Sequence, residues 1–432
     1  MTKSNEFPQE PNAPIFLEEI LITHINGHRL PEPCAAQVVL HLSPKIVLLI
    51  ESESFPIGIV GHTEESFVVK VKDKRDIQVI LYRRSMSGFS NGTAKGAFCL
   101  YKSPITVIPA DARIDSICFS VLNFPEFFGQ QDKWINPNQY TIRLGQTKLV
   151  HNNLQIRLTQ AASFPAQKKY LDQTDGYGIT HTGVIQHCDG KPFSVEEAED
   201  ILRGLRAFLS FSRGAECGLV RVKAVDPEGG QSFLEWGTTH TDSWRCGNDT
   251  WLPTRPDGGE NLSRAFSGFW SLYSCPDWKD VLLRTIDWYL NSKNGPFHIG
   301  IILIQTALES LCCEIVGPKK KGEPMGKFLS ESIKKIGLCT AIPSSCSNLD
   351  DFFQNCPCVG RDGPKAIVAL RNDLVHAKKK YGDNAEVQID ALRLGQWYIE
   401  MILLKKLGYV GRYRNRVSDS GKGSVEDVPW KV

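Results

Sequence analysis

The chain has 432 residues, which is too long for one ordinary domain and fits two or three. Apolar residues make up 41% and charged residues 23%, close to globular averages, so a largely disordered or fibrous chain is excluded. The 50 basic residues nearly balance the 48 acidic ones, for a net charge of +2. No global positive field marks the chain as a nucleic-acid coat, and any polyanion site must be local.

The N-terminal residues and the cysteines predict a soluble cytoplasmic protein. Residues 1–14 form a polar, proline-containing tail without the basic and apolar regions of a secretion signal. The 13 cysteines are spread along the chain, so we expect reduced, mostly buried thiols rather than disulfides. The longest apolar run, 299–304, is too short to span a membrane, and no membrane partner is expected.

Residues 15–255 are predicted to form a β-rich, α+β domain that senses or binds a ligand. Short runs of alternating apolar and polar residues recur at 15–22, 37–42, 66–71, 77–82, 114–121 and 154–159. The glycine- and serine-rich stretch 86–96 is predicted to be a turn. Many short strands favour a sandwich or a barrel, and the sequence leaves these two alternatives open.

A helix is predicted after Pro192 within this region. Ser194 and Glu197 match a capping box, in which the serine caps the helix and the glutamate sits at its third position. An apolar stripe follows as far as Leu209, as in a helix with one buried face. Two strand-like stretches, 218–225 and 232–238, come next.

Residues 260–408 are predicted to form an all-α helical bundle. Helices are expected at 262–273, 277–291, 297–316, 325–336, 364–380 and 385–407, joined mostly by short loops. A cysteine-, serine- and proline-rich insert occupies 337–363, and residues 412–432 are expected to be a mobile tail. The predicted fold class is α+β multidomain, with a β-rich region followed by a helical bundle.

The most informative segment is AIVALRNDLVHAKKK, residues 366–380, which contains Arg371 and His376. On an ideal helix five positions turn by about 500°, so these two side chains lie roughly 140° apart. They can share a site only if the helix ends or distorts near His376, or if the site lies between helices. The structural alternative is a surface arginine and a histidine that caps the helix.

This segment resembles the HEPN superfamily of prokaryotic helical bundles. The resemblance rests on RNDLVH, an Arg-polar-x-x-x-His form of the family motif, and on the helices at 301–316 and 385–407. It implies RNA cleavage without metal or cofactor, in a cleft between two copies of the bundle. Arg371 would hold the phosphate and the charge of the transition state, and His376 would transfer a proton.

Three further residues are predicted to belong to this site. Asn372 would orient the phosphate or the catalytic pair, and Asp373 is a weaker candidate. Gln305 and Glu309 form a polar pair four residues apart on an otherwise apolar helix. Either Glu309 orients Arg371, or this edge of the helix reaches solvent.

Two lysine runs are the local basic patches of the chain. Lys378, Lys379 and Lys380 directly follow the motif and are predicted to attract RNA, and residues 319–321 form a second such run. The alternative is a set of solvated charges at helix ends and in loops.

Cys339, Cys346, Cys356 and Cys358 gather in the insert between helices. Four thiolates could hold zinc, but their spacing matches no common zinc-finger pattern. Reduced loop cysteines are the favoured interpretation, and no metal is assigned to the site.

The layout as a whole is similar to that of ApeA-like anti-phage abortive-infection proteins. That resemblance implies a homodimeric endoribonuclease with RNA as substrate, whose N-terminal region responds to a phage-derived trigger. The competing class is a non-catalytic HEPN module that binds RNA or a partner, with the β-rich region as an adaptor. A partner of a nucleotidyltransferase is a third and weaker alternative.

Overall fold

The computed structural model describes residues 13–42, 46–56, 64–71, 76–90, 93–100, 104–133, 140–237, 240–245, 250–376, 384–418 and 423–430. The chain divides by its own contacts into two compact units. Unit 1 comprises residues 1–126, 152–206 and 217–245, and unit 2 comprises residues 127–151, 207–216 and 246–432. The predicted order, β-rich first and helical second, is confirmed. The chain passes between the units several times, whereas the sequence predicted one boundary between 255 and 260.

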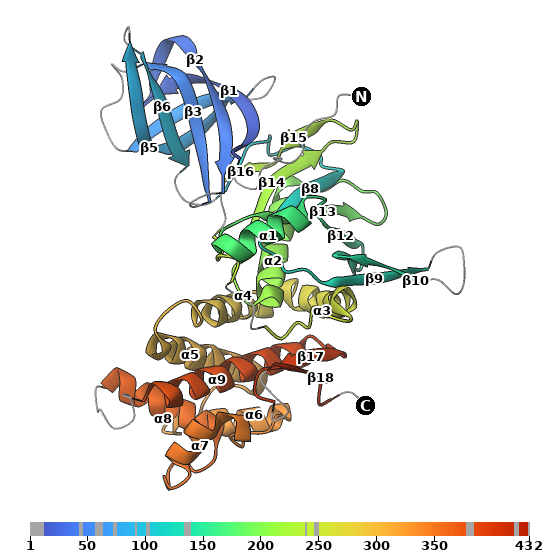
Figure 1. Ribbon diagram of the computed structural model, residues 1–432, viewed down its shortest axis with the longest axis vertical. Helices are drawn as coiled ribbons and strands as arrows, with labels where there is room; N and C mark the ends of the chain where they lie inside the picture. Colours follow the sequence, from blue (N-terminus) through green and yellow to red (C-terminus); the bar gives the residue numbers. More distant parts are fainter. Residues whose placement is uncertain are drawn as a thin grey trace. The chain divides into compact units, whose positions relative to one another are not determined.

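Unit 1 begins with a closed antiparallel β-barrel of strand order β1-β2-β3-β6-β5-β4 (Figure 1). Its strands are β1 (Ile15–Ile25), β2 (His28–His41), β3 (Val47–Pro56), β4 (Glu64–Val71), β5 (Asp76–Ser90) and β6 (Thr93–Leu100). Strand β1 pairs with both β2 and β4, which closes the sheet on itself. Of the two alternatives that the sequence left open, the barrel is observed.

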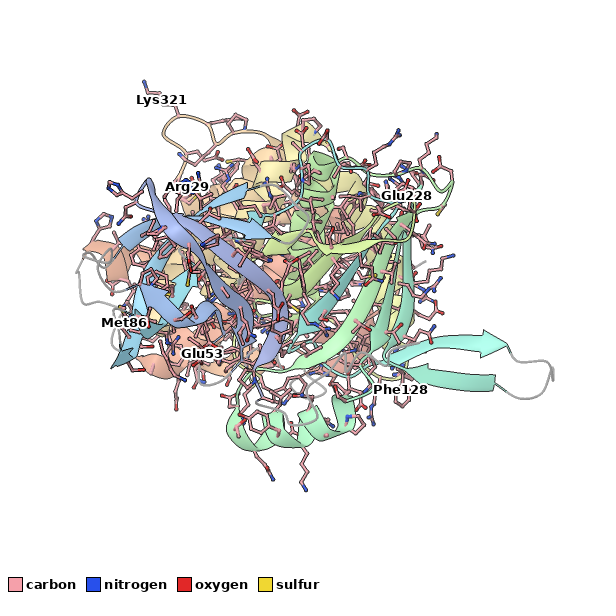
Figure 2. All side chains as sticks on the ribbon, turned by 90° about the horizontal axis from the view of Figure 1, so that it is seen from above. Arg29, Glu53, Met86, Phe128, Glu228 and Lys321 are labelled. Atoms are coloured by element: carbon pink, nitrogen blue, oxygen red, sulfur yellow. The ribbon has the colours of Figure 1, made fainter. Side chains whose placement is uncertain are left out.

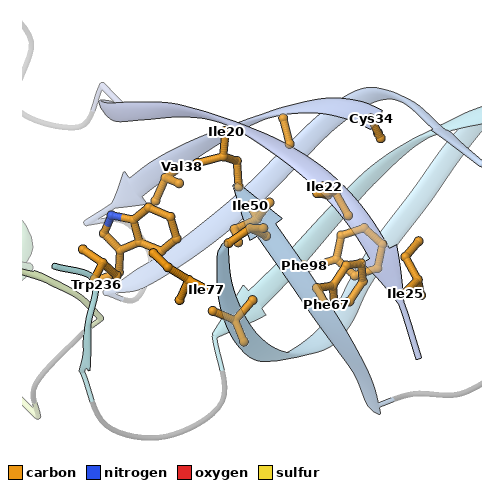
Figure 3. Packing of buried hydrophobic residues seen from close by; sticks show 14 of the residues in the cluster. Ile20, Ile22, Ile25, Cys34, Val38, Ile50, Phe67, Ile77, Phe98 and Trp236 are labelled. Atoms are coloured by element: carbon orange, nitrogen blue, oxygen red, sulfur yellow. The ribbon is translucent and has the colours of Figure 1, made fainter. Parts of the chain in front are cut away.

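Apolar side chains fill the barrel because every second strand residue points inward. Phe55, Phe67 and Phe98 meet there, with ring centroids 4.6 to 5.8 Å apart (Figure 3). Trp236, from strand β16 (Glu235–Trp236), is fully buried in the same cluster. The barrel core therefore combines rings from three strands with a tryptophan from much later in the chain.

The chain reverses direction within the stretch 86–96, as predicted, because β5 and β6 pair antiparallel as far as Ser90 and Thr93, but most of the stretch is strand. Strand β5 continues to Ser90 and β6 begins at Thr93. A Cβ atom at Gly96 would lie 2.8 Å from the Phe98 ring and 3.2 Å from Cβ of Phe55. This glycine is therefore required by close packing against the barrel core rather than by a turn.

The rest of unit 1 contains an antiparallel sheet in which β12, β13, β8, β14 and β15 lie side by side in that order. These strands are β8 (Ser116–Leu122), β12 (Leu154–Gln160), β13 (Ile179–His187), β14 (Leu219–Val225) and β15 (Gln231–Phe233). The short strand β7 (Ile105–Thr106) pairs with β16. The predicted strands near 114–121, 154–159 and 218–225 are confirmed, whereas β13 was not predicted.

Two helices accompany this sheet. Helix α1 (Phe164–Thr174) was not predicted from the sequence. Helix α2 (Val195–Arg213) was predicted, and its capping serine is confirmed, because the Glu197 amide donates to Oγ of Ser194 at 3.1 Å.

Unit 2 is mainly helical. Its helices are α3 (Gly258–Tyr273), α4 (Pro276–Asn291), α5 (Phe297–Val316), α6 (Met325–Ile336), α7 (Ser347–Phe353), α8 (Gly363–His376) and α9 (Ala385–Lys406), with a 3₁₀ turn, η2 (Ser344–Cys346). Five described strands also belong to it. Three of them precede the helices, namely β9 (Phe128–Lys133), β10 (Tyr140–Leu144) and β11 (Gln146–His151), and the other two form a hairpin near the end of the chain. Helices α5 and α6 have the predicted bounds, and α7 lies in the insert where no helix was predicted.

Helix α5 is the central helix of unit 2 and contacts α4, α6, α8 and α9. Among the described residues it is the one helix that is long and apolar enough to cross a membrane by length and composition alone. A core helix passes the same test. At Gly395 of α9 a Cβ atom would lie 2.2 Å from Ile304 of α5 and 3.5 Å from Ile367 of α8. This glycine lets the three helices approach one another closely.

The tail 412–432 was predicted to be mobile, but much of it is ordered. Strand β17 (Arg412–Asn415) pairs with β18 (Ser424–Asp427). Arg416, directly after β17, is only 2% exposed. The prediction was wrong because a polar composition does not reveal that one cation is buried.

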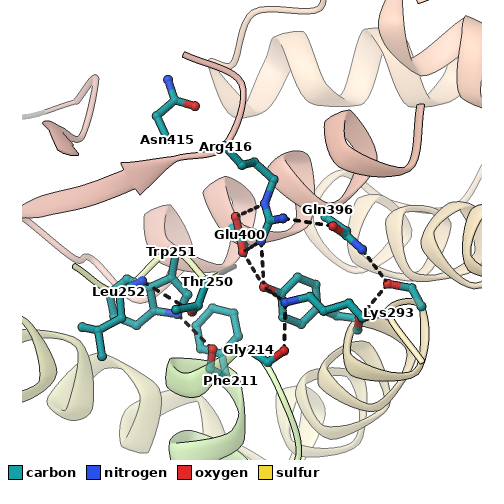
Figure 4. A network of polar contacts seen from close by, with 12 residues as sticks. Phe211, Gly214, Thr250, Trp251, Leu252, Lys293, Gln396, Glu400, Asn415 and Arg416 are labelled. Carbon is teal, nitrogen blue, oxygen red and sulfur yellow. Dashed lines mark hydrogen bonds and ion pairs between the residues drawn. The ribbon is translucent and has the colours of Figure 1, made fainter. Parts of the chain in front are cut away.

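Arg416 belongs to a buried polar network (Figure 4). Its guanidinium bonds both carboxylate oxygens of Glu400 on α9, with Nε 2.9 Å from Oε2. Gln396 accepts from the same guanidinium at 3.0 Å, and the Tyr289 hydroxyl of α4 donates to Glu400. Lys293 Nζ donates to that hydroxyl at 2.9 Å. The network ties the C-terminal hairpin to two helices of the bundle.

Candidate functional site

The motif segment lies on α8, whose start is fixed by local contacts. The Asp362 side chain caps the helix by accepting from the Lys365 amide at 3.1 Å. A Cβ atom at Gly363 would lie 2.7 Å from Leu394 of α9, so α8 begins in close contact with that helix. It ends at His376, and residues 377–383, which include the predicted RNA-binding Lys378, Lys379 and Lys380, lie outside the described residues.

Asn372 and His376 share the exposed face of the last turns of α8. They are four residues apart, which places them one above the other on a helix, and both are exposed. Arg371 is half-buried, and its Nη1 donates to Oδ1 of Asn372 at 3.2 Å. The long arginine side chain therefore turns its guanidinium toward the face that carries His376.

One nitrogen of Arg371 is left without a hydrogen bond. Its Nε is buried and has no partner among the residues that the structure describes. A buried donor without a partner costs about 1–3 kcal/mol. An anionic ligand or a second protein surface at this end of α8 could satisfy the guanidinium.

Asp373 lies on a different face of the same helix. Its side chain is only 5% exposed, beside the fully buried Leu370. The weaker candidate of the predicted site is therefore part of the packed side of α8. It is not on the exposed face with Asn372 and His376.

Glu309 was offered as a carboxylate that orients Arg371, and the structure gives it another partner. Gln305 Nε2 donates to Oε2 of Glu309 at 3.0 Å, so the predicted polar pair exists. Within the described part of the chain no ion pair joins Glu309 to Arg371. The position of Glu309 along α5 explains this.

The directions of the helices separate Glu309 from Arg371. Position 300 of α5 meets Leu392 of α9, and Ile304 meets position 395, so these helices run parallel. Helix α8 contacts α9 and leads into it through residues 377–384, so α8 runs antiparallel to both. Ile304 and Ile367 lie at the same height in the bundle, because both meet position 395. Glu309 lies further along α5 in one direction and Arg371 further along α8 in the opposite direction, so the two residues are about 13 Å apart along the helix axes.

The same directions define one end of unit 2, which we call the motif end. It consists of the C-terminus of α8 and the N-termini of α5 and α9. Four large apolar side chains are 39–45% exposed there: Phe297, Ile299, Val375 and Ile389. His298 is exposed at this end too, although it is 78 positions before His376 and no spacing pattern could have connected them.

The other lysine run lies far from the motif end. Residues 319–321 follow the C-terminus of α5, and a 20-residue helix is about 30 Å long. Lys319 Nζ donates to the Glu323 carbonyl at 2.8 Å, and Lys321 lies on an exposed loop (Figure 2). This run is a solvated loop rather than part of the motif end.

The four cysteines of the insert do not form one cluster. Cys346 is buried, and Arg393 Nη2 donates to its sulfur at 3.4 Å, whereas Cys356 and Cys358 lie with their sulfurs 3.2 Å apart. Burial raises the pKa of the Cys346 thiol. Across the described ranges no three His, Cys, Asp or Glu side chains are grouped to hold a metal ion.

None of the twelve described cysteines forms a disulfide. Four of them are buried: Cys34, Cys217, Cys312 and Cys346. The expectation of mostly buried thiols is therefore wrong, because the other eight reach solvent at least in part.

Comparisons with known proteins were made for the whole chain. Residues 109–247 match the YopA central domain, and residues 275–427, which include α8, match the YopA C-terminal domain. The SPbeta prophage-derived uncharacterized protein YopA of Bacillus subtilis (strain 168) is 26% identical over 363 residues, which cover 80% of this chain and 79% of that protein. No solved structure matches the chain.

Proposed function

We propose, for a chain that carries the central and C-terminal domains of the YopA family, that unit 2 is a metal-independent endoribonuclease of the HEPN type. The observation that carries the proposal is the exposed face of α8. There Asn372 and His376 stack one turn apart, and the Arg371 guanidinium turns toward them through its bond to Asn372.

The chemistry assigned to these residues needs no metal. The RNA 2′-OH attacks the adjacent phosphate once a base removes its proton, and an acid protonates the departing 5′-oxygen. An imidazole performs either task near neutral pH, which is the role proposed for His376. The Arg371 guanidinium binds the phosphate oxygens and offsets the charge that develops on them. Asn372 holds that guanidinium in place.

Two copies are required for this mechanism because each chain contributes one motif histidine. We propose that they meet through the motif end. Phe297, Ile299, Val375 and Ile389 are large apolar side chains exposed at that end, and a second copy would remove them from water. One His376 would then act as the base and the other as the acid.

Unit 1 is proposed to control this activity. A nuclease that attacks the RNA of its own cell needs a resting state, and a binding domain that shifts the population of an active dimer provides one. The Bacillus subtilis relative is named as prophage-derived, which supports a role in phage defence. The location proposed for this role is the cytoplasm. A phage-derived molecule would be the trigger.

The second candidate is a non-catalytic module that binds RNA or a partner protein. The exposed apolar residues of the motif end favour it, because they suit docking whether or not any chemistry occurs. In this alternative Arg371 and Asn372 contact the partner and unit 1 is an adaptor.

The proposed nuclease is tested by comparing wild type, Arg371→Ala, His376→Ala and His298→Ala, both in cells during phage infection and with purified protein and labelled RNA. We expect His376→Ala to slow cleavage by about 10²–10⁴-fold. His298→Ala is the matched control, an exposed histidine at the same end but outside the motif, and should cleave like wild type.

Two further results would count against the nuclease. Cleavage that EDTA abolishes would exclude the metal-free mechanism. RNA left intact by wild type throughout infection, together with loss of dimer in Val375→Asp by light scattering, would favour the non-catalytic module.

A further inference from the structure

One face of the sheet in unit 1 holds a cationic pocket, which we call the sheet pocket. It encloses about 260 Å³. Arg157 of β12 and Arg221 and Lys223 of β14 supply its positive charges. Ser120, Thr159 and Thr182 supply hydroxyl groups from three neighbouring strands. The pocket lies within unit 1, and its assignment does not depend on the proposed nuclease.

Strand register places the hydroxyl groups in one row. Thr159 of β12 is paired with Thr182 of β13, and Thr182 is paired with Ser120 of β8. Directly paired residues in an antiparallel sheet point to the same face, with side chains about 5 Å apart. The three hydroxyls therefore form a line across three strands.

The neighbouring row has a cation at each end. Arg157 is paired with Val184, Val184 with Cys118, and Cys118 with Lys223. Four adjacent strands put the two outer backbones about 14 Å apart. The long side chains of Arg157 and Lys223 can thus approach an anion from opposite sides, above a floor of two small uncharged residues.

A β-bulge adds the third cation. Between Val220 and Lys223 the register of β14 against β8 shifts, so β14 carries one extra residue there. Arg221, inside the bulge, has a φ of +54°, a left-handed conformation that is uncommon and unfavourable for an arginine. Bulges redirect side chains and are common beside binding sites. Here the bulge brings Arg221 to the pocket lining.

No acidic side chain among the described residues lines the sheet pocket. Asp226 and Glu228 lie between β14 and β15, and Asp226 accepts from the Gly230 amide at 2.7 Å. Figure 2 shows Glu228 in this turn. In the part of the chain that the structure describes, Arg157 and Lys223 form no ion pair. Lys223 Nζ lies 5.2 Å from the centroid of the Phe233 ring. The pocket therefore has a net positive charge.

We propose that the sheet pocket binds the phosphate groups of a small phosphorylated molecule. Guanidinium groups bind phosphate oxygens in pairs, and hydroxyl groups donate to the remaining ones. The volume is below the roughly 300 Å³ at which pockets for drug-sized ligands begin, so the bound part is small. A polyphosphate or the phosphate end of a nucleotide has this size and charge.

The test uses the full chain and three probes: inorganic phosphate, pyrophosphate and ADP, in a buffer free of sulfate and phosphate. Binding is measured by calorimetry at two salt concentrations. Arg157→Gln and Lys223→Gln are each expected to weaken pyrophosphate binding by about 10- to 100-fold. The matched control, Arg203→Gln, removes an exposed arginine from helix α2 and should bind like wild type.

Arg221→Gly separates binding from folding. Glycine adopts a φ of +54° without strain, so this variant should unfold at the same or a higher temperature than wild type. It should still bind pyrophosphate at least tenfold more weakly. The sheet pocket lies in unit 1 and its binding is judged from Arg157 and Lys223, so failure of the nuclease proposal would not affect this result.

The ligand source is read from the probes. Equal binding of ADP and pyrophosphate indicates free polyphosphate, and tighter binding of ADP indicates a nucleotide; both support the proposal. The proposal is overturned if none of the three probes binds at millimolar concentration, or if Arg157→Gln and Lys223→Gln bind as wild type does. It is also overturned if only a single-stranded RNA binds in an Arg157-dependent way, because the surface then recognises nucleic acid.

Discussion

The barrel of unit 1 and the helical core of unit 2 bury polar groups in opposite ways. Among the described barrel residues the buried polar side chain is Ser52, a neutral group whose hydroxyl donates to the Ala35 carbonyl at 2.8 Å. Unit 2 buries a full ion pair, Arg416 with Glu400, at 2% and 0% side-chain exposure. The barrel core is thus stabilised by apolar contacts, whereas the C-terminal end of the chain is attached through a buried ion pair.

Because the two regions bury different groups, substitutions should change their stability in different ways. Apolar packing weakens in proportion to the atoms removed, because each contact is small and replaceable. A buried ion pair weakens abruptly, because removal of one partner leaves the other charge without compensation. Substitutions in the barrel should therefore lower the free energy of unfolding gradually, and substitutions in the buried ion pair should lower it abruptly.

The largest loss is expected for Arg416→Met, which leaves Glu400 buried without its cation. We expect the free energy of unfolding to fall by about 3–5 kcal/mol, measured by urea denaturation of the full chain. Arg412→Met is the matched control, on the same hairpin but half-exposed, and should cost less than about 1 kcal/mol. The double variant Arg416→Met/Glu400→Leu should recover part of the loss. If Arg416→Met and Arg412→Met lowered the free energy of unfolding equally, the buried ion pair would not have the stabilising role that distinguishes unit 2 from the barrel.

In the barrel, Phe98→Ala is expected to cost about 3–4 kcal/mol, because it removes one of three rings that pack together. Phe98→Leu keeps most of the apolar volume and should cost much less, which gives the graded response typical of apolar packing. The same urea titration compares them with Phe16→Ala, whose side chain is 53% exposed. A loss for Phe98→Leu as large as that for Phe98→Ala would contradict the graded response.

Unit 1 also buries a histidine in its neutral form. Burial lowers the pKa of His181 to about 3, beside the rings of Phe124 and Phe164. Between pH 6.5 and 3 the unfolded chain binds a proton that the folded chain excludes, so stability is complete above pH 6.5 and is lost as the pH falls. We expect a loss of about 2–3 kcal/mol between pH 7.5 and 4.5.

The matched variant His181→Gln tests the source of this acid sensitivity. Between pH 7.5 and 4.5 its free energy of unfolding should fall by about 2–3 kcal/mol less than that of wild type. An unchanged pH profile would assign the sensitivity to other groups.

The smallest effect is expected at the start of α9. The Asn384 side chain accepts from the amides of Glu386 at 3.0 Å and Val387 at 3.2 Å. Asn384→Ala should therefore cost about 1 kcal/mol, whereas Asn384→Ser should be nearly neutral. Equal losses in the two variants by thermal unfolding would show that the cap does not stabilise this helix.

Much of the secondary structure could be predicted because its signals are local. The bounds of α5 and α6 follow from apolar periodicity and flanking glycine and proline residues, and Ser194 marks the start of α2. Strand β13 was missed because it buries the polar residues Thr180 and His181, which interrupt an apolar pattern, and helix α1 was missed because its sequence is mostly polar. The chain does reverse within the glycine-rich segment 86–96, but the strands extend further into it than predicted, because packing at Gly96 and turns both select glycine.

The candidate site was predictable only in part. The motif residues Arg371, Asn372 and His376 are neighbours in sequence, so one helix brings them together. Whether Glu309 could reach Arg371 depended on the relative direction of α5 and α8, which no local pattern encodes. The exposure of Asn372 and the burial of Asp373 depended on which side of α8 the rest of unit 2 covers.

The sequence by itself determined the order of the two regions, most of the helices and the motif, because each rests on residues within a few positions of one another. Tertiary structure decided the buried partner of Arg416, the closure of the barrel and the row of cations across four strands of the sheet. Those features join residues far apart in the chain. Their electrostatics depend on burial and register, which exist only after the chain has folded.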